Sequence, residues 1–112
     1  MMKSIQPIAQ AFAEGYVERL LQVYSSTMRA LEAEKSEDIL LPVIQRLLRE
    51  MARGATLVEA IHRVNSGLNA MASKRLVLTA AVDIIAHDRK PGDKPTAVPS
   101  CETTFKALGL TP

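Results

Sequence analysis

The amino-acid sequence predicts an all-α protein, and two observations support that prediction. First, apolar residues recur at steps of three or four along the first third of the chain, which places them on one side of an α-helix. These residues are Ile5, Ile8, Phe12, Tyr16, Leu20, Tyr24, Met28 and Leu31. Second, the chain is rich in helix-forming Ala, Leu, Met, Glu and Arg but holds only two Tyr, two Phe and no Trp. We therefore expect a single domain of about four to five helices, with a long first helix, a proline-containing linker and a short last helix.

The first expected helix spans residues 5–34. Ser4 is a suitable N-cap, and Pro7 falls in the first turn, where its missing N–H costs little. At 1.5 Å per residue this helix would be about 45 Å long, whereas a compact domain of about 100 residues has a radius of gyration of only about 13 Å. The apolar stripe is therefore expected to extend beyond its own fold, so that a second chain or another protein covers it.

Two shorter helices are expected between residues 36 and 67. Pro42 lies near the start of the first, and Gly54 is a suitable C-terminal stop. Its buried side is formed by Leu40, Ile44, Leu47, Leu48 and Met51. Thr56 and Glu59 have the spacing of a capping box, which opens the second of these helices.

The next expected helix, from about residue 68 to residue 87, is apolar nearly all round. Between residues 76 and 86 only Thr79 and Asp83 interrupt the apolar sequence. A helix without a polar face is buried on most sides, so we expect this one at the centre of the domain or of a dimer. A buried Asp83 needs a polar partner, and the candidates are Thr79, His87 and an arginine of a partner protein.

The expected organisation has three parts: a helical domain over residues 1–90, an extended linker over residues 91–99, and a short helix over residues 100–112. Proline and glycine make the linker a poor helix former. Ser100 is expected to cap the last helix and Gly109 to end it. The large apolar side chains of this helix, expected to dock on the core or on a neighbouring subunit, are Phe105, Leu108 and Leu110.

Residues that could perform chemistry are few. The histidines are His62 and His87, and Cys101 is the single cysteine. Asp83 and His87 are four residues apart and could touch on one helix face, but no nucleophile or third group completes a catalytic site, and no further ligand completes a metal site. The glycines are isolated, so the chain lacks a phosphate-binding glycine loop. We expect no enzymatic activity, catalytic residue, cofactor or metal.

The sequence also bears on the compartment. A single cysteine excludes an intramolecular disulfide and favours a reducing environment. Glu14, Glu18 and Arg19 interrupt the apolar N-terminal segment, which is therefore not expected to be a signal peptide. The longest apolar run, residues 76–86, is too short to span a bilayer. We expect a cytoplasmic protein that does not contact membranes.

The first expected function is binding of another protein through the apolar helix face. Aromatic residues and Met are enriched at interfaces, and the candidate interface residues are Phe12, Tyr16, Leu20, Tyr24, Met28 and Leu31. The expected partners are a second copy of the chain and a target protein, with transcription regulators among the candidate targets. Binding would modulate or inhibit the target, as an anti-activator does, by occluding a dimerisation or substrate surface. The alternative for the same stripe is an ordinary internal core.

The second expected function is DNA binding by a dimeric helix-turn-helix regulator that uses residues 56–75. The candidate contacts to DNA are Asn69, Ser73, Lys74 and Arg75, at the start of the second helix. The net charge of +2 is small, but residues 39–112 hold ten basic and six acidic side chains, a net of +4. Because two helices joined by a short turn occur in most helical domains, protein binding ranks above DNA binding.

Overall fold

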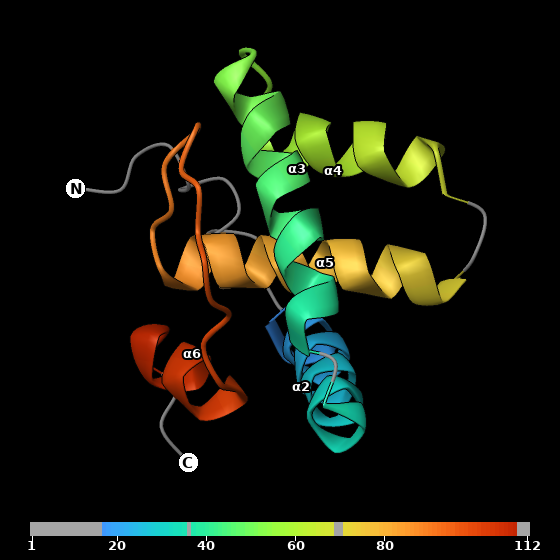
Figure 1. The fold of residues 1–112 in the computed structure, drawn as a ribbon, viewed down its shortest axis with the longest axis vertical. Coiled ribbons are helices and arrows are strands. Elements are labelled where there is room, and N and C mark those ends of the chain that lie inside the picture. The colour runs from blue at the N-terminus through green and yellow to red at the C-terminus, as the bar shows by residue number, and fades with distance from the viewer. Residues whose placement is uncertain (1–16, 36, 69–70, 110–112) are drawn as a thin grey trace.

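The computed structural model describes residues 17–35, 37–68 and 71–109 of the chain. In this part of the chain every regular element is helical and no strand occurs, which confirms the predicted all-α class (Figure 1). The elements are α2 (Val17–Glu34), the 3-10 helix η3 (Glu37–Ile39), α3 (Leu40–Ala52), α4 (Leu57–Ser66), α5 (Met71–Ala86) and α6 (Cys101–Ala107).

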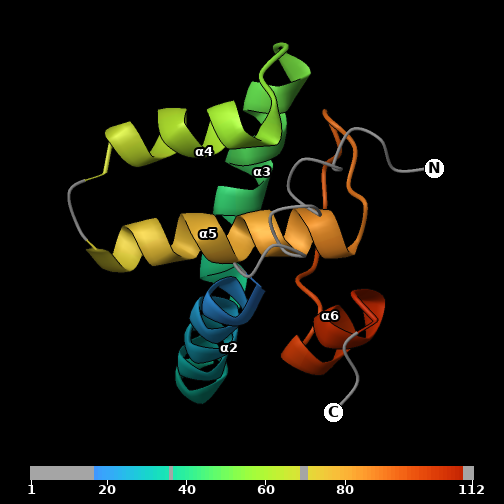
Figure 2. The same cartoon turned by 180° about the vertical axis from the view of Figure 1, so that it is seen from behind.

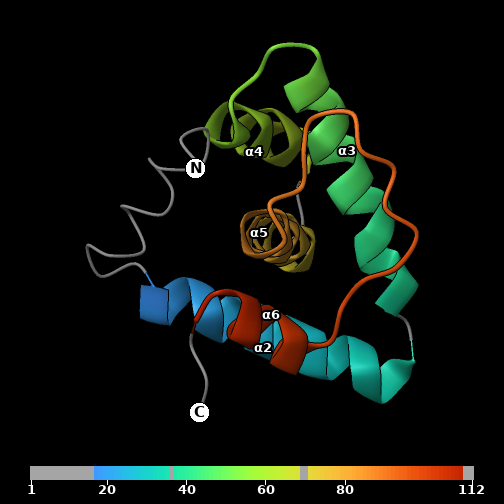
Figure 3. The same cartoon turned by 90° about the vertical axis from the view of Figure 1, so that its left-hand side faces the viewer.

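Helix α5 lies at the centre of the fold. A view along its axis shows α2, α3 and α4 arranged around it (Figure 3). Its side chains are buried without interruption from Thr79 to Ile85. The central position expected for the nearly all-apolar helix is therefore confirmed.

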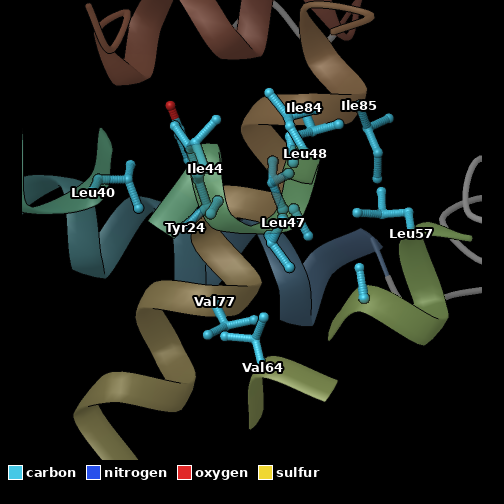
Figure 4. Close-up of a cluster of buried hydrophobic side chains, with 14 of the residues drawn as sticks. Tyr24, Leu40, Ile44, Leu47, Leu48, Leu57, Val64, Val77, Ile84 and Ile85 are labelled. Atoms are coloured by element: carbon cyan, nitrogen blue, oxygen red, sulfur yellow. The ribbon is translucent and has the colours of Figure 1, made fainter. Parts of the chain in front are cut away.

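The surrounding helices approach α5 in different directions. Helix α3 crosses α5, whereas α4 lies alongside it and runs in the opposite direction (Figures 1 and 2). Leu47 and Leu48 of α3 and Ile84 of α5 belong to one cluster of fully buried side chains (Figure 4). Leu57 and Val64 of α4 complete that cluster on the side of the α4–α5 pair. Burial of large aliphatic side chains contributes about 1.5–3 kcal/mol each, which makes this cluster the main source of stability.

Helix α2 is the described part of the predicted long helix. It ends at Glu34, as predicted, and the expected start over residues 5–16 lies outside the described residues. Tyr24, Met28 and Leu31 point into the core, where they are 0%, 1% and 7% exposed. The apolar stripe is therefore internal at these three positions.

The helix ends follow the predicted signals. Thr56 and Glu59 form the predicted capping box: the Thr56 hydroxyl accepts a hydrogen bond from the Glu59 N–H at 3.1 Å, and the Thr56 N–H donates to the Glu59 carboxylate at 2.9 Å. Hydrogen bonding of the Glu59 carboxylate to Thr56 lowers the pKa of Glu59. Gly54 has a φ of +103° just after α3, where a left-handed residue ends the helix. Ser100 caps α6 by accepting the Thr103 N–H at 3.2 Å.

The segment between α5 and α6 follows the surface of the helical core (Figure 3). The Gly92 N–H donates to the Leu48 carbonyl at 3.4 Å, and the Gln45 side-chain amide donates to the Pro95 carbonyl at 3.1 Å. Val98 packs against the core cluster. The residues of the expected extended linker are thus held against α3.

Candidate functional site

Helix α6 is attached to α2 by two contacts of Tyr24, one a hydrogen bond and the other a ring–ring contact. The hydroxyl oxygen of Tyr24 lies 2.5 Å from Oγ1 of Thr104, and both residues are fully buried. The rings of Tyr24 and Phe105 are tilted against one another, with centroids 6.1 Å apart. Burial raises the pKa of the Tyr24 phenol well above its ordinary value, so the hydroxyl is neutral when it forms this contact.

A groove of about 600 Å³ lies beside this attachment, between α2 and α6. Its walls are Leu21, Gln22, Ser25, Ser26 and Arg29 from α2 and Phe105 from α6. Leu21 and Phe105 are only partly buried, because one side of each packs on the core and the other faces the groove. Hydroxyl groups and the exposed Arg29 surround these two apolar side chains. We call this feature the α2–α6 groove.

Cys101 lies at the start of α6, close to the α2–α6 groove. Burial raises the pKa of its thiol, while a hydrogen bond with Ser25 acts in the opposite direction. A raised pKa keeps the thiol protonated at neutral pH, and the protonated form is a poor nucleophile. The geometry of Cys101 therefore fits a packing role in α6.

The structure separates the six interface residues predicted from sequence. Phe12 and Tyr16 lie outside the described residues. Leu20 is partly buried and packs against the core. The remaining three, Tyr24, Met28 and Leu31, are core residues, because α5 and α6 cover that face of α2. Leu21, on the neighbouring face of α2, is partly buried and lines the α2–α6 groove.

Asp83 lies fully buried in the middle of the fold, and its partner is an arginine of the same chain. Arg89 donates from Nε to Oδ1 of Asp83 at 2.6 Å, and Nδ1 of His87 lies 3.6 Å from Oδ2. Thr79 donates instead to the Arg75 carbonyl at 2.7 Å. Of the expected candidates, His87 lies near the Asp83 carboxylate, Thr79 bonds elsewhere, and Arg89 of the same chain takes the place of the expected arginine of a partner protein. The ion pair fixes the segment that follows α5.

Of the four residues predicted to contact DNA, the structure exposes two. Asn69 lies outside the described residues, Ser73 is half-buried, and Lys74 and Arg75 are exposed on the first turns of α5. Helices α4 and α5 run side by side in opposite directions, which is the arrangement of an αα-hairpin (Figures 1 and 2). A helix-turn-helix instead requires two helices that cross at about 90–120°.

Helices α3 and α4, joined by the turn over residues 53–56, do lie across one another (Figure 1). The outward side of α4 offers few free donors, because Arg63 donates to Glu50 at 3.3 Å and Glu59 is acidic. His62 and Ser66 are the other exposed polar side chains beyond the N-cap. This face lacks the cluster of basic side chains that usually accompanies DNA recognition.

Comparisons with known proteins identify no relative: no protein-family model matches the chain, and no curated protein or solved structure is significantly similar to it. Within residues 17–35, 37–68 and 71–109, no helix combines the length and the apolar character needed to cross a bilayer. The same residues contain no group of three or more His, Cys, Asp or Glu side chains placed to hold a metal ion.

The α2–α6 groove could not be identified from the sequence alone. The groove forms because the hydrogen bond between Thr104 and Tyr24 holds α6 beside α2, and these two residues are 80 positions apart in the sequence. Helical periodicity marks the buried stripe of α2, but Leu21, Gln22 and Ser25 have no distinctive spacing. The one signal was Phe105, whose size identified the last helix as an element that docks.

Proposed function

We propose that this protein is a small non-enzymatic regulator in the cytoplasm, which binds another protein at the α2–α6 groove and inhibits or modulates it. The observation that supports this proposal is the composition of the groove: two partly exposed apolar side chains, Leu21 and Phe105, surrounded by hydroxyls and one cation. Interfaces have this arrangement of an apolar centre inside a polar rim.

The groove also suggests the chemistry of the partner. An amphipathic helix can bury one or two apolar side chains against Leu21 and Phe105. Among the described residues that line the groove, Arg29 is the charged one, so a carboxylate on the partner would be complementary to it. The expected partner segment is therefore amphipathic and acidic. Binding of that segment in the groove would cover the surface that the target uses for its own dimerisation or for contact with its substrate.

The case for homodimerisation changes with the described fold. Helix α2 has 18 residues, which corresponds to about 27 Å, and the molecule extends over 35 Å along its longest axis. This part of the stripe therefore fits within a single chain. We propose a different protein as the main partner, and sedimentation equilibrium of the isolated protein measures whether it also binds itself.

A photo-crosslinking experiment tests the proposal. A benzoylphenylalanine at position 22, in the groove wall, should trap the partner in cells, and mass spectrometry identifies the trapped protein. Ser26→Glu adds a charge to the groove at an exposed position and should weaken binding of the purified partner by about tenfold or more. Ser66→Glu is the matched control, because Ser66 is an exposed serine on α4.

The same assay distinguishes the DNA-binding alternative. Lys74→Ala combined with Arg75→Ala should leave partner binding unchanged, because both side chains are exposed on α5 away from the groove. The proposal fails if Ser66→Glu weakens binding as much as Ser26→Glu does. It also fails if the Lys74 and Arg75 variant loses activity in cells together with a salt-sensitive shift of duplex DNA in a gel.

A further inference from the structure

A second groove, of about 350 Å³, lies between α3 and the segment that follows α5, and the proposed function does not use it. It is lined by Gln45, Arg49 and Ala52 from α3 and by Gly92, Asp93 and Lys94 from that segment. Like the α2–α6 groove it is lined mostly by polar side chains, but its described lining holds three charged residues, Arg49, Asp93 and Lys94, whereas that of the α2–α6 groove holds one, Arg29. We call this feature the α3 groove.

Backbone contacts fix the segment that forms the outer wall of the α3 groove. The Lys90 N–H donates to the Asp93 carboxylate at 2.7 Å, and the Asp93 N–H donates to the Lys90 carbonyl at 3.0 Å, which closes a tight turn. Gly92 adopts a φ of +87° within this turn and donates its N–H to Leu48 of α3. The Pro95 carbonyl accepts from the Gln45 side chain. Lys94 is therefore held between two anchored positions.

The charges of the α3 groove are not balanced. Arg49 and Lys94 form no ion pair with any described residue, whereas Arg53, Arg89 and Lys90 each have an acidic partner within 4.0 Å. Asp93 is the acidic residue among the described lining residues, and one of its oxygens already accepts the Lys90 N–H.

The flanking helix surface adds to this positive potential. Arg46, exposed one turn before Arg49 on α3, likewise has no ion pair among the described side chains. Its position places a third cation next to the groove without filling it, since Arg46 is not part of the lining. The field at the α3 groove therefore attracts anions.

We propose that the α3 groove binds the phosphoryl group of a small phosphorylated ligand. The planar guanidinium of Arg49 can donate to two phosphate oxygens at once, and the ammonium group of Lys94 can contact a third from the opposite wall. A phosphate monoester carries about −1.5 to −2 charges at pH 7, which matches two cations better than a single carboxylate does. The volume leaves room for a small organic group on the phosphate.

The test is a titration followed by amide and arginine Nε signals in nuclear magnetic resonance, with ionic strength held constant by sodium chloride. Inorganic phosphate and O-phosphoserine are the two probes. Both should produce saturable shifts at Gly92, Asp93, Lys94 and the Arg49 side chain. Arg49→Gln and Lys94→Gln, each at an exposed position, should weaken binding by about fivefold while circular dichroism remains unchanged.

Lys74→Gln serves as the control, because Lys74 is an exposed lysine near the start of α5, whereas the described lining of the α3 groove comes from α3 and from the segment after α5. Tighter binding of O-phosphoserine than of inorganic phosphate would support an organic substituent, and equal binding would assign the site to the phosphoryl group alone. Shifts that do not saturate, or an equal loss in Lys74→Gln, overturn the proposal. So does a DNA duplex that binds in an Arg49-dependent manner when neither small probe does, because the groove would then contact a nucleic-acid backbone.

Discussion

Tyr24 and Thr104 share a buried hydrogen bond that connects α2 to α6 across 80 residues of sequence. Both side chains are completely shielded from solvent, and the Phe105 ring packs against the Tyr24 ring in a tilted arrangement, with the centroids 6.1 Å apart. A hydroxyl in such a place has no access to water, so each partner depends on the other. This pair holds α6 in position and thereby forms one wall of the α2–α6 groove.

Removing one hydroxyl of this pair should destabilise the fold. Tyr24→Phe leaves the Thr104 hydroxyl buried without a hydrogen-bond partner, and Thr104→Val leaves the Tyr24 hydroxyl in the same state. Each variant should therefore lose about 1–3 kcal/mol of unfolding free energy, as measured by urea unfolding. The double variant buries no unsatisfied hydroxyl and should lose less than the sum of the two. Additive losses, within about 0.5 kcal/mol, would contradict a direct bond between the two side chains.

Stability should also fall at alkaline pH because of Tyr24. Burial, assisted by the charges of Asp83, Cys101 and Glu32, raises the pKa of the phenol above its ordinary value of 10.0, and the hydrogen bond to Thr104 offsets part of this rise. The folded state therefore keeps the proton that the unfolded state releases. The stabilisation is complete below pH 10.0 and is lost as the pH rises above it.

Urea unfolding at about pH 8 and about pH 11 measures this effect. Lysines also titrate in this range, so the informative quantity is the difference between the wild type and Tyr24→Phe. The wild type should lose more unfolding free energy between the two pH values than the variant does. An equal loss in both proteins would assign the alkaline sensitivity to other groups.

The turn between α3 and α4 should tolerate glycine better than any other residue. Gly54 has a φ of +103°, so Gly54→Ala should cost about 1–3 kcal/mol, although an added Cβ would meet no atom within 4 Å. Gly67, after α4, has a φ of −90° and ordinary space for a Cβ, 3.7 Å from the Val64 carbonyl oxygen. Gly67→Ala should therefore be neutral or stabilising by up to about 1 kcal/mol. Thermal unfolding measures the stability of the two variants. An equal loss of stability in Gly54→Ala and Gly67→Ala would show that the positive φ of Gly54 is not the cause of the loss.

Much of the fold could be predicted from the sequence because its helices have strong local signals. Apolar spacing located the buried side of α3, and the pattern of Thr56 and Glu59 marked the start of α4 with its hydrogen bonds. The absence of a polar face identified α5 as the central helix. Each of these signals depends on residues that are neighbours within a single helix, and so it can be read without knowledge of the rest of the chain.

The candidate sites could not be predicted because they depend on how distant segments meet. An apolar stripe containing Tyr24 and Met28 looks the same whether another helix of the same chain or a partner covers it, and here α5 and α6 cover it. Arg89 is only six residues from Asp83, but it lies beyond the end of α5, where helical spacing no longer relates two side chains. The α3 groove likewise depends on the path of a proline-rich segment whose direction no local pattern determines.

The ion pair between Asp83 and Arg89 gives the last prediction. The Asp83 side chain is fully buried and that of Arg89 is 14% exposed, so the loss of either charge leaves the other in a poorly solvated place. Asp83→Asn and Arg89→Gln should each reduce the unfolding free energy by about 3–5 kcal/mol. The double variant should recover a large part of that loss, because a buried pair of neutral amides costs far less than one unpaired charge.

The neighbouring residue supplies a matched control for this experiment. Lys90 pairs with Asp88 at 3.0 Å, but the two side chains are 62% and 35% exposed, so solvent screens the interaction. Lys90→Gln should therefore change the unfolding free energy by less than about 0.5 kcal/mol. If Arg89→Gln has an effect as small as that of Lys90→Gln, the segment after α5 is held mainly by its backbone contacts to Leu48 and Gln45, and the buried ion pair contributes little to its position.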